Sequence, residues 1–150
     1  MSKHAAQRAN PAYAEVLQKA VLAMPMAREL GLQFRRVAPG EVDLFIPYRD
    51  AWSFRPGQLQ ATAIFAPAEF AAVAAASTLL PSGWINASID CTLKIVGPAD
   101  GEALLARGRV VDAGRLLSVC AADVFALREG KETLCATALA TARNIEVKNQ

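Results

Sequence analysis

Apolar and polar residues alternate along most of the second half of the chain. Between Trp84 and Ile95 the apolar positions are Ile85, Ala87, Ile89, Cys91, Leu93 and Ile95. A period of two is typical of a half-buried strand, because successive side chains point to opposite faces of a sheet. The pattern recurs over residues 102–111, 116–127 and 133–142, with a glycine-containing turn before each of these segments. It predicts four consecutive antiparallel strands.

The first half of the chain contains another alternating segment and a helical one. Val42, Leu44 and Ile46 precede Pro47, which predicts a strand that ends at the proline. Residues 11–28 carry apolar side chains at three- and four-residue spacing, which predicts an amphipathic helix capped by Asn10.

The stretch 54–80 is apolar and rich in alanine, and Pro81 and Gly83 follow it, so it contains the longest predicted helix. The order of elements indicates an α+β fold, with this central helix against one curved antiparallel sheet and a helix flanking it. A sheet of this kind has an edge and apolar surface left to cover, so we expect a homodimer or a larger homo-oligomer.

Glu69 is the only charged residue between Arg55 and Asp90. In a helix its neighbours three and four residues away include Phe65, Ala66, Ala72 and Val73, which would place the carboxylate on an apolar stripe and bury most of it. Carboxylates in such surroundings are common in active sites. The alternative interpretation starts the helix at Pro67, so that Glu69 lies in the first turn and the helix dipole stabilises it.

Composition excludes several functions. The net charge is +2 and the charges are scattered, so neither nucleic acid nor a membrane surface is an expected partner. The single histidine, His4, makes a histidine-based triad or a metal site improbable. The three cysteines are widely spaced in apolar runs, which indicates free thiols, and the polar N-terminus lacks a secretory pattern. We therefore expect a cytoplasmic protein that binds no metal or cofactor and does not span a membrane.

The stretch around Glu69 resembles the hotdog-fold acyl-CoA thioesterases of the phenylacetate-pathway (PaaI-like) group. In that family a Gly-x-x-His-Gly-Gly loop precedes the central helix, and an Asp or Glu follows the histidine by nine residues. Here the loop is GQLQAT over residues 57–62, and Glu69 follows Gln60 by nine. SIDCTLKIVGPADG, VVDAGRLL and ATALATARN resemble later strands and turns of the family.

The resemblance implies roles for individual residues. Glu69 would be the general base or the nucleophile at a thioester carbonyl, the Ala61 N–H would bind the carbonyl oxygen, and Gln60 would orient the reactants. Further substrate contacts would come from Phe54, Thr62 and Val73 around the site, and from Lys94 and Arg115 at coenzyme A phosphates.

The implied function is hydrolysis of an acyl-CoA or aryl-CoA thioester. The alternative is a hotdog protein that binds such a ligand without hydrolysing it, because Gln60, Ala61 and Thr62 replace the family's His-Gly-Gly. The expected organisation is a flanking helix over residues 1–24, a hotdog domain over 25–144 and a polar tail over 145–150.

Overall fold

The computed structural model describes residues 10–147, and His4 and the end of the predicted tail lie outside this range. Its helices are α2 (Tyr13–Leu22), α3 (Pro25–Glu29) and α4 (Ala61–Ser77), with a short 3₁₀ turn, η1, at Asp50–Trp52. Its strands are β1 (Gln33–Ala38), β2 (Glu41–Pro47), β3 (Ser53–Arg55), β4 (Gln58–Leu59), β5 (Trp84–Ile95), β6 (Ala103–Ala113), β7 (Leu117–Arg128) and β8 (Lys131–Glu146).

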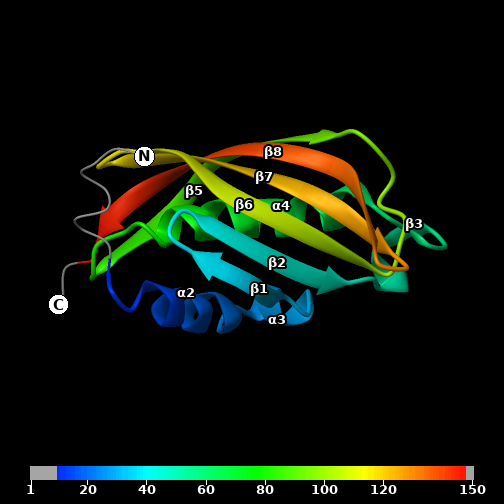
Figure 1. The fold of residues 1–150 in the computed structure, drawn as a ribbon, viewed down its shortest axis with the longest axis horizontal. Helices are drawn as coiled ribbons and strands as arrows, with labels where there is room; N and C mark the ends of the chain where they lie inside the picture. Colours follow the sequence, from blue (N-terminus) through cyan, green and yellow to red (C-terminus); the bar gives the residue numbers. More distant parts are fainter. Residues whose placement is uncertain (1–9, 148–150) are drawn as a thin grey trace.

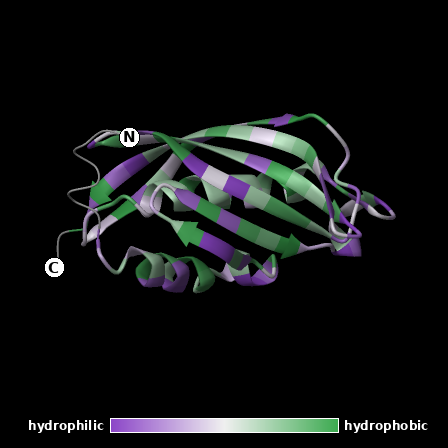
Figure 2. Ribbon diagram, in the orientation of Figure 1, coloured by the Kyte–Doolittle hydropathy of each residue, from purple (hydrophilic) through white to green (hydrophobic). Residues whose placement is uncertain are grey.

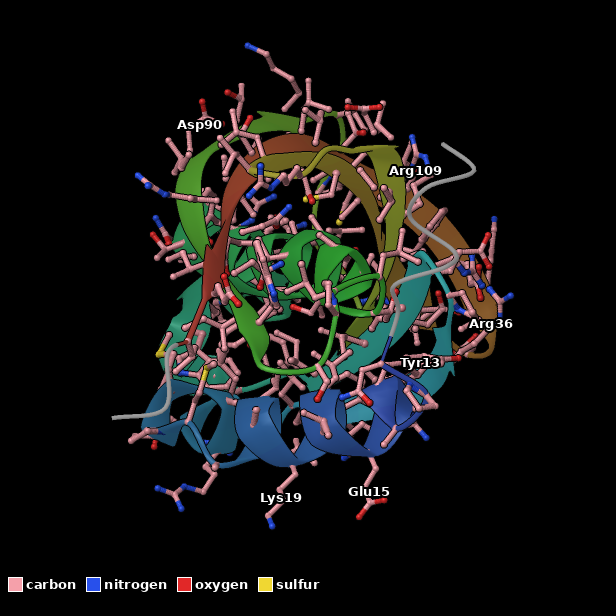
Figure 3. The ribbon with its side chains drawn as sticks, turned by 90° about the vertical axis from the view of Figure 1, so that its left-hand side faces the viewer. Tyr13, Glu15, Lys19, Arg36, Asp90 and Arg109 are labelled. Atoms are coloured by element: carbon pink, nitrogen blue, oxygen red, sulfur yellow. The ribbon has the colours of Figure 1, made fainter. Side chains whose placement is uncertain are left out.

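Six of the strands form one antiparallel sheet in the order β1-β2-β6-β7-β8-β5. Figure 1 shows this sheet in front of α4, with α2 and α3 running beside the β1 edge. Seen along α4, the sheet curves over the helix and α2 lies below it (Figure 3). The described residues thus form the α+β arrangement expected from the sequence, a long helix wrapped by a curved sheet.

The concave face of the sheet packs against α4 and forms the core. Leu44, Ala106, Val124 and Ala136 are register partners across four strands, and all four are fully buried. Figure 2 shows hydrophobic and hydrophilic residues alternating along β2, as expected when one face of a strand is covered. The alternation predicted for β2 is therefore confirmed.

Small residues allow α4 to approach the sheet closely. Alanines fill the buried side of the helix, and a Cβ at Gly108 of β6 would overlap the carbonyl group of Ala71. Glycine is required at this position because the helix backbone occupies the space that any side chain would need. The contact sets the depth at which α4 lies in the sheet.

The single helix predicted for residues 11–28 is wrong, because α2 and α3 are separate helices. α2 begins at Tyr13 rather than Pro11, and Asn10 accepts a hydrogen bond from the Ala12 N–H in a turn ahead of it. The break falls at Met24, whose extended backbone is the conformation that a following proline favours, and Pro25 opens α3.

Two further elements were not predicted. β1 pairs with β2 through residues that include Arg36, and Arg35 is a bulged residue beside it. The charges of these two arginines obscure the strand pattern in the sequence. The loop expected between Arg49 and Gly57 contains η1 and the β3–β4 hairpin.

Candidate active site

The alternation predicted along β5 is wrong for half of the strand, because a β-bulge interrupts it. Ser88 pairs with Ala142 and Asp90 pairs with Thr141, so Ile89 is an extra residue between them. An extra residue turns every later side chain to the opposite face. Ser88 and Cys91 consequently both face α4, and Asp90 points outward, as Figure 3 shows.

Glu69 lies in the middle of α4, where its carboxylate meets the inner face of β5. α4 begins six residues before Pro67, so the alternative that made Glu69 a first-turn residue is wrong. The Ser88 hydroxyl donates a hydrogen bond to Glu69 Oε1. Glu69 is half-buried in the single chain, where the sequence predicted that most of it would be buried.

Thiols lie near Glu69, and no cation among the described residues forms an ion pair with it. The pKa of the Cys91 thiol is raised by burial, and the negative charges of Glu69 and Asp90 raise it further. Burial also raises the pKa of Cys120 to about 12. Between residues 10 and 147, no lysine or arginine forms an ion pair with Glu69. The carboxylate therefore has a neutral hydrogen-bond donor and no charged partner in the described chain.

The first turn of α4 presents one backbone N–H group, that of Ala61, that has no acceptor within the described residues. Gln60 is the N-cap, and its side-chain oxygen accepts a hydrogen bond of 2.7 Å from the Thr62 N–H. The Ala61 N–H has no acceptor within residues 10–147, and Ala61 is exposed. A donor of this kind at a helix start can bind an oxygen that gains negative charge.

One side of α4 is not covered by the described chain. The stripe consists of exposed or half-buried residues at helical spacing: Ala61, Thr62, Phe65, Ala66, Glu69, Phe70, Val73 and Ser77. It runs from the helix start past Glu69 to Val73, whose carbonyl accepts a hydrogen bond from Asn86 of β5. The structure therefore places Ala61, Thr62, Glu69 and Val73 on one continuous surface.

A mostly apolar cavity of about 310 Å³ opens beside the first half of this stripe. Met26, Leu30 and Trp52 form its apolar wall. Gln60, Thr62 and Ala66 border it on the helix side, and Ala66 is one turn from Glu69. Met26 and Leu30 were not expected at the site, and they lie in segments that carry no motif of their own.

The remaining predicted residues lie apart from Glu69. Phe54 is 61% exposed on the β3–β4 hairpin, where the Arg55 guanidinium lies over its ring. Lys94 pairs with Thr137 on the convex face, on the opposite side of the sheet from Glu69. Arg115 lines a cavity of about 120 Å³ beyond the C-terminal end of α4. The buried Asn144 side chain donates hydrogen bonds to the carbonyls of Gly114 and Arg115 and so holds this turn.

Comparison with known structures identifies the fold as the hotdog fold. A thioesterase family protein from Silicibacter pomeroyi superposes with a TM-score of 0.86 at 29% identity, over 89% of this chain and 98% of that one. A thioesterase from Haemophilus influenzae superposes with a TM-score of 0.78 at 20% identity, over 92% and 93% of the two chains.

A phenylacetic acid degradation-related protein from Ralstonia eutropha gives 0.74 at 23% identity, over 87% of this chain and 98% of that one. The structural neighbours thus include thioesterases and a protein related to phenylacetic acid degradation, in agreement with the resemblance seen in the sequence. Neither a protein-family profile nor a curated protein matches the sequence. No helix within residues 10–147 is long and apolar enough to cross a membrane.

Proposed function

We propose that this protein hydrolyses an acyl-CoA or aryl-CoA thioester, with Glu69 as the catalytic carboxylate. The observation that carries the proposal is the position of Glu69: an isolated carboxylate on the open side of α4, held by a hydroxyl and paired with no cation in the described chain. Such a carboxylate keeps its capacity to accept a proton or to attack a carbonyl. The likeness to thioesterases supports the reaction class.

In the proposed reaction Glu69 takes a proton from water as the water attacks the thioester carbonyl, or attacks the carbonyl itself to give an anhydride that water then cleaves. The Ala61 N–H binds the carbonyl oxygen as negative charge develops. Gln60 has its side-chain oxygen engaged with the Thr62 N–H, so only its amide NH₂ group is free to contact the reactants.

Glu69 and Ala61 of one chain are poorly placed to act on the same carbonyl. Eight residues separate them in one helix, which corresponds to about 12 Å along its axis. Each group must lie within about 3–3.5 Å of the same substrate carbonyl, which a separation of about 12 Å does not allow. We therefore propose a homodimer in which Glu69 of one copy works with Ala61 of the other.

The free edge of β5 and the uncovered stripe of α4 lie on the same side of the chain, and they are the surfaces that a second copy would cover. A dimer built on this side would also enclose Glu69 more completely than the single chain does. A tetramer of two such dimers is compatible with the same site.

The acyl or aryl group would occupy the apolar cavity beside Trp52, which has room for an aromatic ring or a medium-length chain. Coenzyme A phosphates would extend towards Arg115, near the end of α4. Lys94 is a weaker candidate because it lies on the convex face. Coenzyme A enters as part of the substrate, so no cofactor is required, and the free thiols suit a reducing cytoplasm.

The test is the release of free thiol from a panel of acyl-CoA and aryl-CoA thioesters by the wild type and by Glu69→Gln. Turnover that falls by a factor of about 10² or more in a folded Glu69→Gln protein supports the proposal. Wild-type protein that binds the thioesters, measured as a rise in Tm, but releases no thiol supports the binding protein instead. The absence of the family's His-Gly-Gly motif is the feature that favours this alternative.

Complementation between two inactive variants tests the shared site. Ala61→Pro removes the proposed oxyanion donor, and Glu69→Gln removes the carboxylate. Random mixing of the two refolded variants would give heterodimers with one intact site each, hence about a quarter of wild-type turnover. A mixture that stays inactive would place both residues of each site on a single chain.

A further inference from the structure

We propose that Ser88 is a positioning residue that fixes the Glu69 carboxylate for the reaction proposed above. A role of Ser88 in catalysis rests on that proposed function. The hydrogen bond between Ser88 and Glu69 is present in the structure whatever the function. Ser88 comes from the edge strand β5, and its hydroxyl donates to Glu69 Oε1 across the gap between strand and helix. Nothing in the sequence pattern places a hydroxyl there, because Ser88 alternates with apolar residues as an outward-facing residue would.

The β-bulge at Ile89 is what turns Ser88 inward. Counting back from Cys91, which faces α4, a regular strand would place Ile89 inward and Ser88 outward. The extra residue reverses this and leaves the Ile89 side chain 57% exposed. Bulges of this kind occur next to active sites, where they re-aim one side chain. Here the re-aimed side chain is the one that contacts the carboxylate.

The direction of the hydrogen bond determines what Ser88 can do. A deprotonated carboxylate only accepts hydrogen bonds, so the hydroxyl must donate to it. The bond occupies Oε1 and holds the side chain in one rotamer, which leaves Oε2 for the attacking water or the carbonyl carbon. Val73, one helical turn after Glu69 in the same stripe, has no polar side-chain group, so Ser88 is the hydroxyl that the described structure offers to Glu69.

The other groups near Glu69 do not offer the same contact. Cys91 faces α4 from the same strand, but burial raises the pKa of its thiol and a thiol is a weak donor. Cys120 of β7 is fully buried, and its thiol is directed to the Ala140 carbonyl. Asp90, which precedes Cys91 on β5, points to the convex side and away from Glu69.

The experiment compares Ser88→Ala with Ser88→Thr, which keeps the hydroxyl, and with Thr92→Ala, which removes an exposed hydroxyl from the outer face of β5. Two quantities are measured for each protein: kcat and KM for the best thioester, and the carboxyl ¹³C resonance of Glu69, assigned by its absence in Glu69→Gln. The resonance reports the hydrogen bond whether or not the protein turns over.

We expect Ser88→Ala to lower kcat on the order of 10- to 100-fold with KM little changed, because a loosened carboxylate costs rate and not binding. Its Glu69 resonance should shift, Ser88→Thr should restore both quantities, and Thr92→Ala should change neither. An unshifted resonance in Ser88→Ala, or a kcat equal to that of the wild type, would overturn the assignment. A wild type without turnover would overturn the proposed hydrolase, and the resonance alone would then decide whether Ser88 holds Glu69.

Discussion

Carboxylates on the convex side and on the concave side of the sheet have different partners. On the convex face Glu132 accepts two hydrogen bonds from Arg107, at 2.7 and 2.9 Å, and Asp123 pairs with Arg109 at 3.1 Å. On the concave side Glu69 of α4 contacts the Ser88 hydroxyl and forms no ion pair within residues 10–147. In Figure 3 the labelled Arg36 and Arg109 point away from α4, which is the side on which the ion pairs lie.

The carboxylates of Glu132 and Asp123 are held by arginines and support the structure. The carboxylate of Glu69 has no such partner in the described chain and is available for a reaction. An arginine fixes the position of the carboxylate that it binds, and the hydrogen bond to Glu132 in turn raises the pKa of Arg107. A hydroxyl fixes position alone and leaves the charge available. Substitutions along α4 and the inner side of β5 should therefore change turnover, and those on the convex face should change stability by small, salt-dependent amounts.

Ala61→Pro should give the largest of the following effects. Loss of one oxyanion donor typically lowers kcat by about 10²–10³. The fold should tolerate the change, because proline is favoured at the first helical position and the Gln60 backbone, with φ −73° and ψ 153°, already suits a residue before proline. Thiol release and Tm are measured together, with Thr92→Ala, on the outer face of β5, as the control. A Tm far below that of the control would leave the loss of activity explained by misfolding and would contradict the prediction.

Gly108→Ala should cause the largest loss of stability. The new methyl group would overlap the Ala71 carbonyl, so α4 must move away from the sheet, at a cost of about 1–3 kcal/mol or more. For a chain of this size that is a fall in Tm of roughly 2–4 °C per kcal/mol. Gly97→Ala is the control, since its Cβ would lie 3.3 Å from the nearest atom, the Leu134 carbonyl oxygen. Equal melting temperatures for the two variants would contradict the close contact at Gly108.

Alkylation of Cys91 should report the charge of Glu69. That charge raises the pKa of the Cys91 thiol, so Glu69→Gln should lower the pKa, increase the thiolate fraction near pH 8.5 and speed alkylation severalfold. Cys120 and Cys135 are fully buried and should not react on this timescale. Asp123→Asn, on the convex face, should leave the rate unchanged. A slower reaction in Glu69→Gln would contradict the arrangement of the two side chains.

Glu132→Gln should have the smallest effect. It removes a surface ion pair in which both side chains are roughly two-fifths exposed, so we expect a loss of stability of about 1 kcal/mol or less. The loss should shrink as salt is raised from low to high concentration. Urea unfolding at two salt concentrations measures it. A change in kcat for this variant would weaken the distinction between the two faces.

The fold could be predicted from the sequence because its determinants are local and repetitive. Alternation along β2, β6, β7 and β8, and the alanine-rich run of α4, follow directly from which face of each element is buried. The break at Pro25 and the bulge at Ile89 could not be predicted in the same way. The break depends on whether Pro11 or Pro25 begins a helix. The bulge changes the register of β5, and the continued alternation of apolar and polar residues hides this change.

Some residues of the candidate site could be identified from the sequence. Glu69 could be identified as a candidate because it is the one charged residue in a long apolar stretch. Its place in the helix could not be predicted, because the helix could have begun either before Pro67 or at Pro67. The position of Pro67 inside α4 shows that packing against the sheet outweighs the cost of a proline within a helix. Ser88 was missed because it reaches Glu69 through a bulge in β5, which the sequence pattern does not reveal.

The central claim is that the carboxylate on the inner side of the sheet, and not those on the convex face, carries the chemistry. The most direct measurement is kcat for free-thiol release by Glu69→Gln and Asp123→Asn, each checked for wild-type secondary structure and Tm. We predict that Glu69→Gln loses a factor of about 10²–10⁴ and that Asp123→Asn retains wild-type turnover. Unchanged thiol release by a folded Glu69→Gln protein would contradict the account.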